Sequence, residues 1–596
     1  MFILKKKQYR LYDFIIIPFR ISPFYITFKI IDNILISLLP AAKVLLTTKF
    51  IDTAITIFNN QTANHNIYLS LFFLMIIIIV QNFNQYLVAY LDMKITFSME
   101  RFFVNSIINK REALEYRHIE NNETWELINR TCNNAYGNIS QGLNNFINLV
   151  GILISIASLL IILSEKVLWA GIAIVIISVP LIYISYKTGI HSYKANIDAE
   201  KFKRRAGYYE GVLRSRENIE ERTLFGYSDV LNDIWLEKYE IARKINMKTN
   251  IKNYLTVKTS GLIMAVLTIL ISSVLIIPLN GGLITVGLFV SLIAANMEMV
   301  ETIARQLSGC MKLIAYGKEY MRDLTLFCSL SELHGASELP CKNTIEFESI
   351  EFKNVTFRYP DTNRDILKSF TMSIKKNRHY AFVGVNGAGK TTITKLLLQL
   401  YNNYDGEILI NGKELRNYPP SQIKGLFAAI FQDMARYYIP FKSSIELGDI
   451  FEEDIDRLNQ CIVDLELNGV LQKLPDGINT WLGKIKENGV DLSGGEWQRI
   501  AIARVLYNTA PIRILDEPTA ALDPIVESNI YQMFNKLSKG KTTISITHRL
   551  GAAKIADEII VIDDGYVKEQ GSHQELIALN GLYASMYNKQ KSWYEE

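Results

Sequence analysis

The sequence predicts a multi-domain protein in which an all-α domain of six membrane-spanning helices is followed by an α/β domain. Three observations lead to this prediction. Ile, Leu and Val form long runs in the first half, and six of these runs approach the ~20 residues that cross a bilayer. The second half has the composition of a soluble domain and places a short apolar strand directly before a glycine-rich loop and a helix. The chain of 596 residues is also too long for one hydrophobic core.

The six apolar stretches are expected to cross the membrane. They lie near residues 25–48, 66–91, 143–164, 167–188, 257–278 and 283–305. One such stretch alone could be a buried helix of a soluble protein, but six in succession, paired by short turns, argue against that alternative. Residues 1–24 place basic residues around a short apolar core that contains Pro18. This pattern predicts an amphipathic segment lying against the membrane and not a signal peptide.

The placement of Lys and Arg predicts the orientation of the chain. The connections at 92–142 and 187–256 are basic, whereas the alternate connections are poor in charge. Basic loops face the cytoplasm, so we expect a multi-pass protein of the cell membrane whose second half is cytoplasmic. Both basic connections look helical and turn near 118–125 and 221–229. These tips mix aromatic and charged residues, which suits either docking onto another domain or a solvated hairpin end.

Charge and cysteine usage argue against several classes of protein. The net charge of +4 is too small to indicate a nucleic-acid partner, and none is expected. The five cysteines are odd in number, scattered and free of any C-x-x-C pair. Neither a disulfide framework nor a zinc site is therefore expected.

Polar side chains within the apolar stretches are costly in a membrane and often functional. The candidates for a cargo cavity are Lys43, Gln81, Gln85 and Glu298. The alternative for the amides is hydrogen bonding between helices. For Lys43 we favour the cavity, because an unpaired ammonium should not face lipid. Glu301 and Arg305 stand four residues apart and can form an ion pair.

Residues 384–392 read G-x-x-x-x-G-K-T-T and follow the apolar run His379–Val383. This context is typical of a phosphate-binding loop, in which glycines let backbone N–H groups curl around phosphate oxygens at a helix N-terminus. Lys390 is expected to reach the outer phosphates, and Thr391 is expected to ligate Mg²⁺. The alternative is a chance glycine-rich turn.

Five further motifs follow in a fixed order. They are Phe431–Asp433 (FQD), Leu492–Arg499 (LSGGEWQR), Ile512–Pro518 (IRILDEP), Ala520–Asp523 (AALD) and Ile546–His548 (ITH). In this order they resemble the Q-loop, signature, Walker B strand, D-loop and switch histidine of ABC-type ATPases. With the six stretches ahead of it, the whole chain resembles an ABC exporter half-transporter. The resemblance implies a transmembrane domain over 1–335, a linker over 336–344 and an α/β P-loop ABC ATPase domain over 345–596.

The resemblance also implies a role for each motif residue. ATP would be held by Tyr359, Gly384, Asn386, Gly387, Ala388, Gly389, Lys390, Thr391 and Thr392, and across a dimer interface by Ser493, Gly494 and Gly495. Mg²⁺ and the attacking water would be arranged by Thr391, Gln432 and Asp516. Glu517 would act as general base or orient that water, with His548 on the γ-phosphate and Gln432 as the third catalytic residue.

Two copies of this chain would form two competent sites, because Glu517 and the signature glycines are both present. A homodimer is therefore expected, and a separately encoded partner stays open. By resemblance the tips near 118–125 and 221–229 would be coupling helices. Glu496 stands where the family usually has Gln, and Arg513 stands where an apolar residue is usual. We expect the Walker B strand to have one semi-exposed face because of Arg513.

The predicted function is ATP-driven export from the cytoplasm by alternating access. Within exporters the chain is most similar to those of nisin-type lanthipeptides and other ribosomal peptides. That similarity rests on Ala520–Pro524, on the segment Met434–Pro440 and on Tyr208–Val212. Export of lipophilic drugs or lipids is the first alternative. A non-pumping, ATP-gated regulator is the second, against which the intact Glu517 argues.

Overall fold

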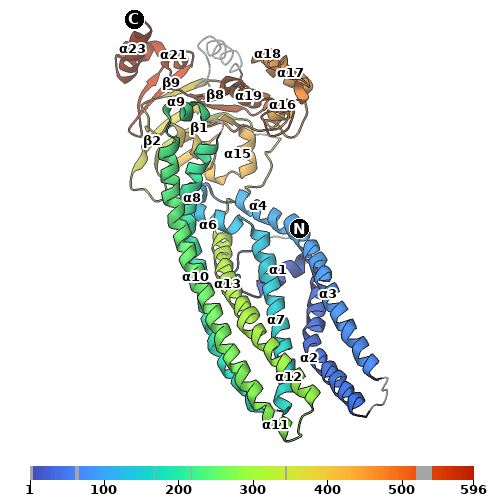
Figure 1. Cartoon of the computed structure of the whole chain (residues 1–596). Helices are drawn as coiled ribbons and strands as arrows, with labels where there is room; N and C mark the ends of the chain where they lie inside the picture. Colours follow the sequence, from blue (N-terminus) through green and yellow to red (C-terminus); the bar gives the residue numbers. More distant parts are fainter. Residues whose placement is uncertain are drawn as a thin grey trace. The chain divides into compact units, whose positions relative to one another are not determined.

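The computed structural model describes residues 4–60, 66–166, 168–215, 218–342, 345–517 and 540–595. The chain forms two compact units, which are shown in Figure 1. The first, the helical unit, comprises Met1–Arg111 and Glu123–Leu330. The second, the ATPase unit, comprises Ser331–Glu596 together with the short segment Glu112–Asn122. The tip of the first basic connection thus belongs in part to the ATPase unit.

Helices make up the regular structure of the helical unit in the ranges that are described. They are α1 (Asp13–Ile21), α2 (Pro23–Asn60), α3 (Asn66–Met99), α4 (Asn105–Glu112), α6 (Asn122–Cys132), α7 (Ala135–Lys166), α8 (Leu168–Arg214), α9 (Ile219–Phe225), α10 (Ser228–Val274), α11 (Ile276–Asn280), α12 (Val286–Glu301) and α13 (Ser308–Ser329). Two π-helical turns, η1 (Glu100–Val104) and η2 (Thr302–Leu307), join α3 to α4 and α12 to α13.

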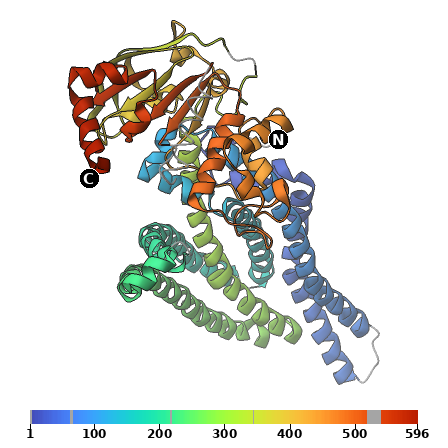
Figure 2. The same ribbon diagram turned by 90° about the horizontal axis from the view of Figure 1, so that it is seen from above.

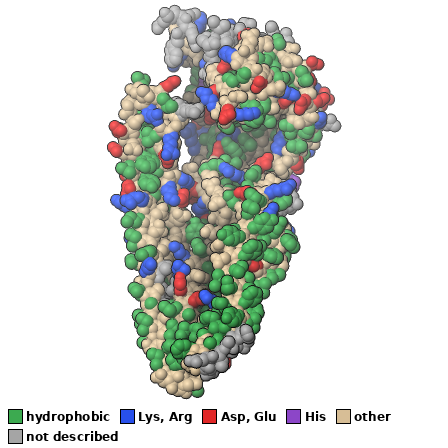
Figure 3. Space-filling view, turned by 45° about the vertical axis from the view of Figure 1, so that its right-hand side comes forward, with side chains coloured by type: hydrophobic (Ala, Val, Ile, Leu, Met, Phe, Trp, Pro, Cys, Tyr) green, Lys and Arg blue, Asp and Glu red, His purple; other side chains and the backbone are tan. Residues whose placement is uncertain are grey.

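Five helical segments of the described ranges are long and apolar enough to cross a membrane. They are Pro23–Asn59, Ile67–Glu112, Ala135–Glu165, Ser228–Asn280 and Val286–Ser329, and they overlap five of the six predicted stretches. The other stretch, 167–188, falls in α8, apart from Val167, which lies outside the described residues. Hydrophobic side chains gather over these helices on the face drawn in Figure 3.

The second basic connection continues the spans as helices, as predicted. Helices α8 and α10 have 47 residues each, which corresponds to about 70 Å, more than twice the thickness of the hydrocarbon core. The two helices pack against each other and run side by side in Figures 1 and 2. Their turn is made by α9.

Two sheets organise the ATPase unit. The first is antiparallel, in the order β2–β1–β4–β5, with β1 (Ser349–Arg358), β2 (Asp365–Lys375), β4 (Tyr404–Ile410) and β5 (Lys413–Glu414). The second has the order β10–β9–β3–β8–β7–β6, with β3 (His379–Val383), β6 (Phe427–Ile430), β7 (Ile512–Asp516), β8 (Thr542–Ile546), β9 (Glu558–Asp563) and β10 (Tyr566–Gly571). Its strands β9, β3, β8, β7 and β6 are parallel, and β10 is antiparallel to β9.

Helices surround these sheets. They are α5 (Tyr116–Glu120), α14 (Lys390–Leu397), α15 (Pro420–Leu426), α16 (Phe441–Glu446), α17 (Ile455–Asp464), α18 (Asn468–Leu471), α19 (Gly494–Tyr507), α21 (Leu550–Ala553), α22 (His573–Leu579) and α23 (Leu582–Glu595). The sheet core includes Phe352, Phe382, Ile514 and Ile544, all at most 1% exposed.

The burial of the strands follows their sequence pattern with one exception. Strand β1 alternates between buried and less buried positions, as its period of two predicts, whereas β3 is buried throughout, as a central parallel strand should be. Strand β7 is also buried at all five positions, including Arg513. The prediction of a semi-exposed face on this strand is therefore wrong. Both faces of β7 pack in the core, with Ile514 in one hydrophobic cluster and Leu515 in another, and burial lowers the pKa of Arg513.

Candidate functional site

The glycine-rich loop lies between β3 and α14, at the strand-to-helix turn that the sequence predicts. Gly387 and Gly389 have φ angles of +82° and +106°, a region that glycine adopts without steric cost. A Cβ atom on Gly389 would lie 2.8 Å from the side chain of Leu367. The loop backbone can therefore take this path only with glycine at these positions.

A cavity of about 440 Å³, the ATP cavity, lies over this loop. It is lined by Tyr359, Ile366, Asn386, Gly387, Gly389, Lys390, Thr391, Thr392, Gln432, Glu517, Ile546 and His548. The fold thus brings together residues from five distant motifs. Ile366 lies outside the motifs and was not expected to line the cavity, because isoleucine in a strand looks like core; Ile546 belongs to the ITH motif but was given no role there.

Lys390 carries the positive charge of the loop. Its Nζ donates hydrogen bonds to the carbonyl oxygens of Gly384 at 2.9 Å and Val385 at 3.0 Å. Burial lowers the pKa of Lys390, while the nearby carboxylates of Glu517 and Asp516 oppose that shift. The ammonium is thus held inside the loop by groups that point at the cavity.

Asp516 ends β7 and is 2% exposed. Burial raises its pKa to about 6, although a hydrogen bond with Thr391 acts in the opposite direction. Its Oδ2 atom has no hydrogen-bond partner among the described residues. Asp516 is not among the residues that line the ATP cavity, but its hydrogen bond with Thr391 joins it to that lining, to which Gln432 also belongs. The three side chains offer oxygen donors, the kind that Mg²⁺ prefers.

Glu517 follows directly and adopts a left-handed backbone conformation, with φ of +48°. Its N–H donates to the carbonyl of Ile546 at 3.0 Å, and its Oε1 lies 2.9 Å from Nε2 of His548. Burial and the charge of Lys390 lower the pKa of His548, while Glu517 opposes them. A neutral imidazole that donates to the carboxylate orients Glu517 at the cavity. Strained backbone of this kind is typical of active sites.

Tyr359 lines the ATP cavity from its place beyond β1. Its hydroxyl lies 3.0 Å from Oγ1 of Thr392, and its ring makes edge contacts with Phe357 and Tyr401. An aromatic ring beside the phosphate loop is suited to stacking on a nucleotide base.

The signature residues do not line the ATP cavity of their own chain. Ser493 caps α19, accepting a hydrogen bond from the N–H of Glu496, while the Glu496 carboxylate accepts one from the N–H of Ser493 at 2.8 Å. This capping box explains why glutamate is suited to position 496. Ser493 and Gly494 are exposed. The predicted D-loop, Ala520–Asp523, lies outside the described residues.

A second cavity of about 620 Å³, the membrane cavity, lies in the helical unit. It is lined by Asn33, Ile36, Ser37, Pro40, Gln81, Asn148, Gly151, Ile152, Ser155, Glu298, Thr302, Arg305, Gln306, Gly309, Cys310 and Leu313. Gln81 and Glu298 are among the lining residues, and their role in binding cargo stays a prediction. The expected pair of Arg305 and Glu301 forms at 2.6 Å.

Lys43 and Gln85 do not line this cavity, and their place in a cargo cavity stays a prediction. The cavity face of α2 passes through Asn33, Ser37 and Pro40, and the helical period continues this face to Val44, which is buried. Lys43 lies about 100° away from Val44 around the helix and is exposed. Gln85 lies one turn beyond Gln81 on α3 and is also exposed.

Two groups of charged residues in the helical unit were missed. The buried Lys29 of α2 pairs with Asp92 and donates to Asn144 Oδ1 at 2.6 Å. Asp52 accepts hydrogen bonds from Thr285 Oγ1 at 2.6 Å and from the N–H of Gly287 at 2.8 Å, at the start of α12. A charge inside or beside an apolar stretch was the available signal.

Comparison with known proteins agrees with this geometry. Residues 367–520 match the protein-family model described as ABC transporter. The chain is 30% identical to the subtilin transport ATP-binding protein SpaT of Bacillus subtilis over 494 residues, which cover 80% of this chain and 78% of the relative. It is 28% identical to the ATP-dependent lipid A-core flippase of Pseudomonas putida, over 86% of this chain and 84% of the relative.

A solved structure has the same fold. It is described as a bacterial Atm1-family ABC exporter with ATP bound, and it aligns with a TM-score of 0.74 at 23% identity, over 94% of this chain and 98% of the other. The protein therefore belongs to the ABC transporter family, as a multi-pass membrane exporter that carries its cytoplasmic ATPase unit on the same chain.

Proposed function

We propose that this exporter moves a ribosomally made or modified peptide out of the cytoplasm, working as a homodimer that hydrolyses ATP in the ATP cavity. The observation that carries the proposal is the pair of polar cavities, one lined by the ATPase motifs and one lined by membrane helices. Each part of the proposal is supported by residues of this chain.

In the ATP cavity, Lys390 and the loop N–H groups from Asn386 to Thr392 would bind the phosphates, and Tyr359 would stack on adenine. Thr391, Gln432 and Asp516 would hold Mg²⁺, which neutralises charge on the phosphates when bound. Glu517 would orient or deprotonate the attacking water, with its carboxylate positioned by His548. Tyr359, Lys390, Thr391, Gln432, Glu517 and His548 line one cavity, and Asp516 is joined to it by its hydrogen bond with Thr391.

A second copy would complete each site. Ser493, Gly494 and Gly495 start helix α19, whose N-terminus favours negative charge, yet they do not line their own chain's ATP cavity. The tip helix α9 exposes Leu224 (77%) and Phe225 (70%), an apolar pair that a second copy's ATPase unit could cover. A homodimer would satisfy both features and would contain two identical sites.

For the membrane part, we propose six spans, with α8 supplying the fourth across 167–188. The proposed transmembrane domain is 1–335, the linker 336–344 and the ABC nucleotide-binding domain 345–596. The long apolar start of α8 and its packing against α10 and α13 support its place among the spanning helices.

The cargo is proposed from the chemistry of the membrane cavity. Its lining offers amides from Asn33, Gln81 and Asn148, hydroxyls from Ser37, Ser155 and Thr302, and one charge of each sign from Glu298 and Arg305. Such groups can pair with peptide amides and side chains. The relative named for subtilin transport supports the same cargo class. Lipids or lipophilic drugs remain the alternative, supported by the relatives named as lipid A-core flippases.

The test is ATPase activity of the purified protein in lipid nanodiscs, with Glu517→Gln beside the wild type. Subtilin, lipid A and tetraphenylphosphonium would each be titrated. Stimulation by subtilin alone, absent in the variant, supports peptide export. Stimulation only by lipid A or tetraphenylphosphonium would replace peptide with the alternative cargo. A wild type as inactive as the variant with every probe contradicts the homodimeric pump and leaves the non-pumping regulator.

A further inference from the structure

We propose that Lys395 couples nucleotide binding to the order of helix α5, as a positioning residue that joins the base-binding ring of Tyr359 to Glu120. This inference rests on the proposed nucleotide site. The residues involved, here called the coupling cluster, are Tyr116, Glu120, Tyr359, Lys395 and Tyr401. All five belong to the ATPase unit.

The charged half of the coupling cluster fixes α5 to the ATPase core. Lys395 Nζ lies 2.7 Å from Glu120 Oε1, and the Tyr401 hydroxyl donates to Glu120 Oε2. Both carboxylate oxygens are thus used by groups 275 and 281 positions away in the chain. Lys395 stands on α14, the helix that begins at the phosphate loop.

The aromatic rings of the coupling cluster connect Tyr116 of α5 to Tyr359, the residue proposed to stack on the base. The rings of Tyr116 and Tyr401 meet edge to face at 5.7 Å, and those of Tyr401 and Tyr359 at 5.4 Å. Lys395 Nζ lies 5.2 Å from the ring centre of Tyr116 and 5.3 Å from that of Tyr359. One ammonium therefore contacts the base-binding ring, a ring of α5 and the carboxylate of α5.

The charge states agree with this arrangement. Burial raises the pKa of Glu120, but hydrogen bonds from Lys395 and Tyr401 outweigh it, and the net shift is downward. Burial lowers the pKa of Lys395, but the hydrogen bond to Glu120 together with the charges of Glu120, Tyr359 and Tyr116 outweighs it, and the net shift is upward. Both directions favour the charged pair at neutral pH.

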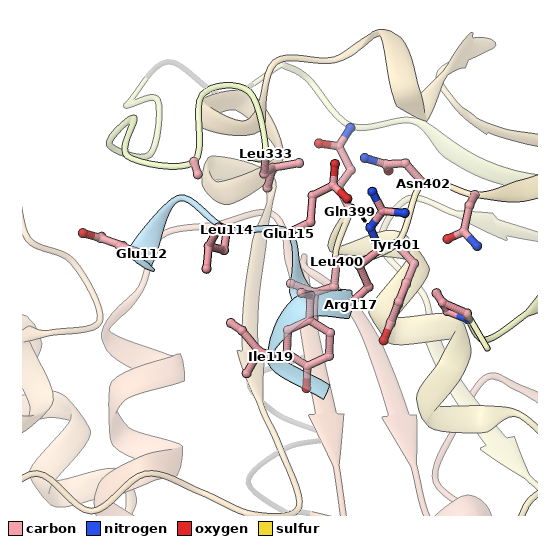
Figure 4. Close-up of a pocket in the computed structure, with 14 residues that line it drawn as sticks. Glu112, Leu114, Glu115, Arg117, Ile119, Leu333, Gln399, Leu400, Tyr401 and Asn402 are labelled. Carbon is pink, nitrogen blue, oxygen red and sulfur yellow. Dashed lines mark ion pairs between the residues drawn. The ribbon is translucent and has the colours of Figure 1, made fainter. Parts of the chain in front are cut away.

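Helix α5 depends on such contacts for its order. It has five residues, none of them buried, and so short a helix is not stable in isolation. A cavity of about 600 Å³ lies beside it, and Figure 4 shows Arg117 and Ile119 of this segment next to Leu400 and Tyr401. The packing around α5 is therefore incomplete, which leaves room for its position to change.

Nucleotide binding would act through this cluster by restricting motion. A base stacked on Tyr359 limits the freedom of that ring, and the ring contacts both Lys395 and Tyr401. Those two residues hold Glu120, so the restriction passes to α5. ATP binding would thus order the segment that leads back into the membrane helices.

The test is hydrogen–deuterium exchange of the segment 112–122 in the full-length protein in nanodiscs, with and without Mg²⁺ and a non-hydrolysable ATP analogue. In the wild type we expect the analogue to slow exchange about tenfold, because restricted motion of the coupling cluster makes local opening of α5 less frequent. In Lys395→Met we expect nearly the same exchange with and without the analogue. Lys395→Arg keeps a cation that can contact both rings and Glu120, so it should retain the analogue-dependent protection that Lys395→Met loses.

Asn121→Ala is the matched control. Asn121 also ties this segment to the ATPase core, through a 2.8 Å hydrogen bond to Asp361 that does not involve Tyr359. Asn121→Ala should raise exchange of 112–122 overall but keep its dependence on the analogue. Lys395→Met would behave in the same way if Lys395 had a purely structural role.

Analogue binding is measured in parallel with a fluorescent nucleotide. If Lys395→Met binds the analogue and keeps full protection, the inference is wrong. The same holds if the wild type binds the analogue without protection of 112–122. If the wild type binds no nucleotide, the proposed nucleotide site itself is wrong and the inference falls with it.

Discussion

The ATP cavity and the membrane cavity differ in what holds their polar side chains. In the ATP cavity, the groups stand on a strained loop, on strand ends and on a helix start, and backbone geometry fixes them, as for Gly389 and Glu517. In the membrane cavity, polar groups come from side chains on facing helices and stand among apolar residues such as Ile36 and Leu313. A site that hydrolyses one nucleotide needs fixed geometry, whereas a site for a flexible cargo can accept several arrangements.

The largest effect is expected for Glu517→Gln. Loss of the carboxylate that faces the ATP cavity should lower ATP turnover about 10²–10³-fold, as for loss of a general base, while ATP binding is kept. Phosphate release in nanodiscs measures this. Glu407→Gln, which removes an exposed carboxylate on β4, is the control. Turnover near the wild-type value in Glu517→Gln would remove Glu517 from the chemistry.

A similar loss is expected for Asp516→Asn, because its partnerless carboxylate oxygen is the proposed Mg²⁺ ligand. Turnover should fall about 100-fold, and added Mn²⁺ should no longer bind at the ATP cavity in an electron paramagnetic resonance titration. Asp405→Asn, an exposed residue of β4, serves for comparison. Unchanged Mn²⁺ binding in Asp516→Asn would place the metal elsewhere.

Gly389→Ala tests the fixed backbone of the ATP cavity. The added Cβ meets Leu367 at 2.8 Å, and φ of +106° is strained for alanine. ATP binding should weaken about 5- to 100-fold. Gly469→Ala, where the structure has open space and ordinary helical backbone, should bind ATP normally. Equal binding by both variants would show that the loop adapts.

The smallest effects are expected in the membrane cavity. Gln81→Ala and Glu298→Gln should each change the subtilin concentration for half-maximal ATPase stimulation by about two- to fivefold, since each removes one hydrogen-bonding group from an adaptable lining. Lys43→Ala and Gln85→Ala, outside the cavity, should leave it unchanged. The reverse pattern would move the cargo site to the other face of α2 and α3.

How well a site residue could be predicted depends on whether local sequence decides where its side chain lies. Thr391, Asp516 and Glu517 stand at the ends of strands or the start of a helix, where local sequence decides the turn, so their convergence followed from motif order. Lys43 could not be placed this way, because a helix of uniformly apolar character gives no clear inward face. In the folded unit α2 packs against α7 and α12, and this packing buries Val44 and leaves Lys43 exposed.

By itself, the sequence determined the two-part organisation, five of the apolar spans and the place of the glycine-rich loop between a strand and a helix, because hydrophobic runs and turn-forming glycines act over short distances. Only the tertiary structure decided that Arg513 is buried, that Glu112–Asn122 belongs to the ATPase unit and that Glu120 meets Lys395. Each of these depends on contacts between residues far apart in the chain, which leave no local pattern to read.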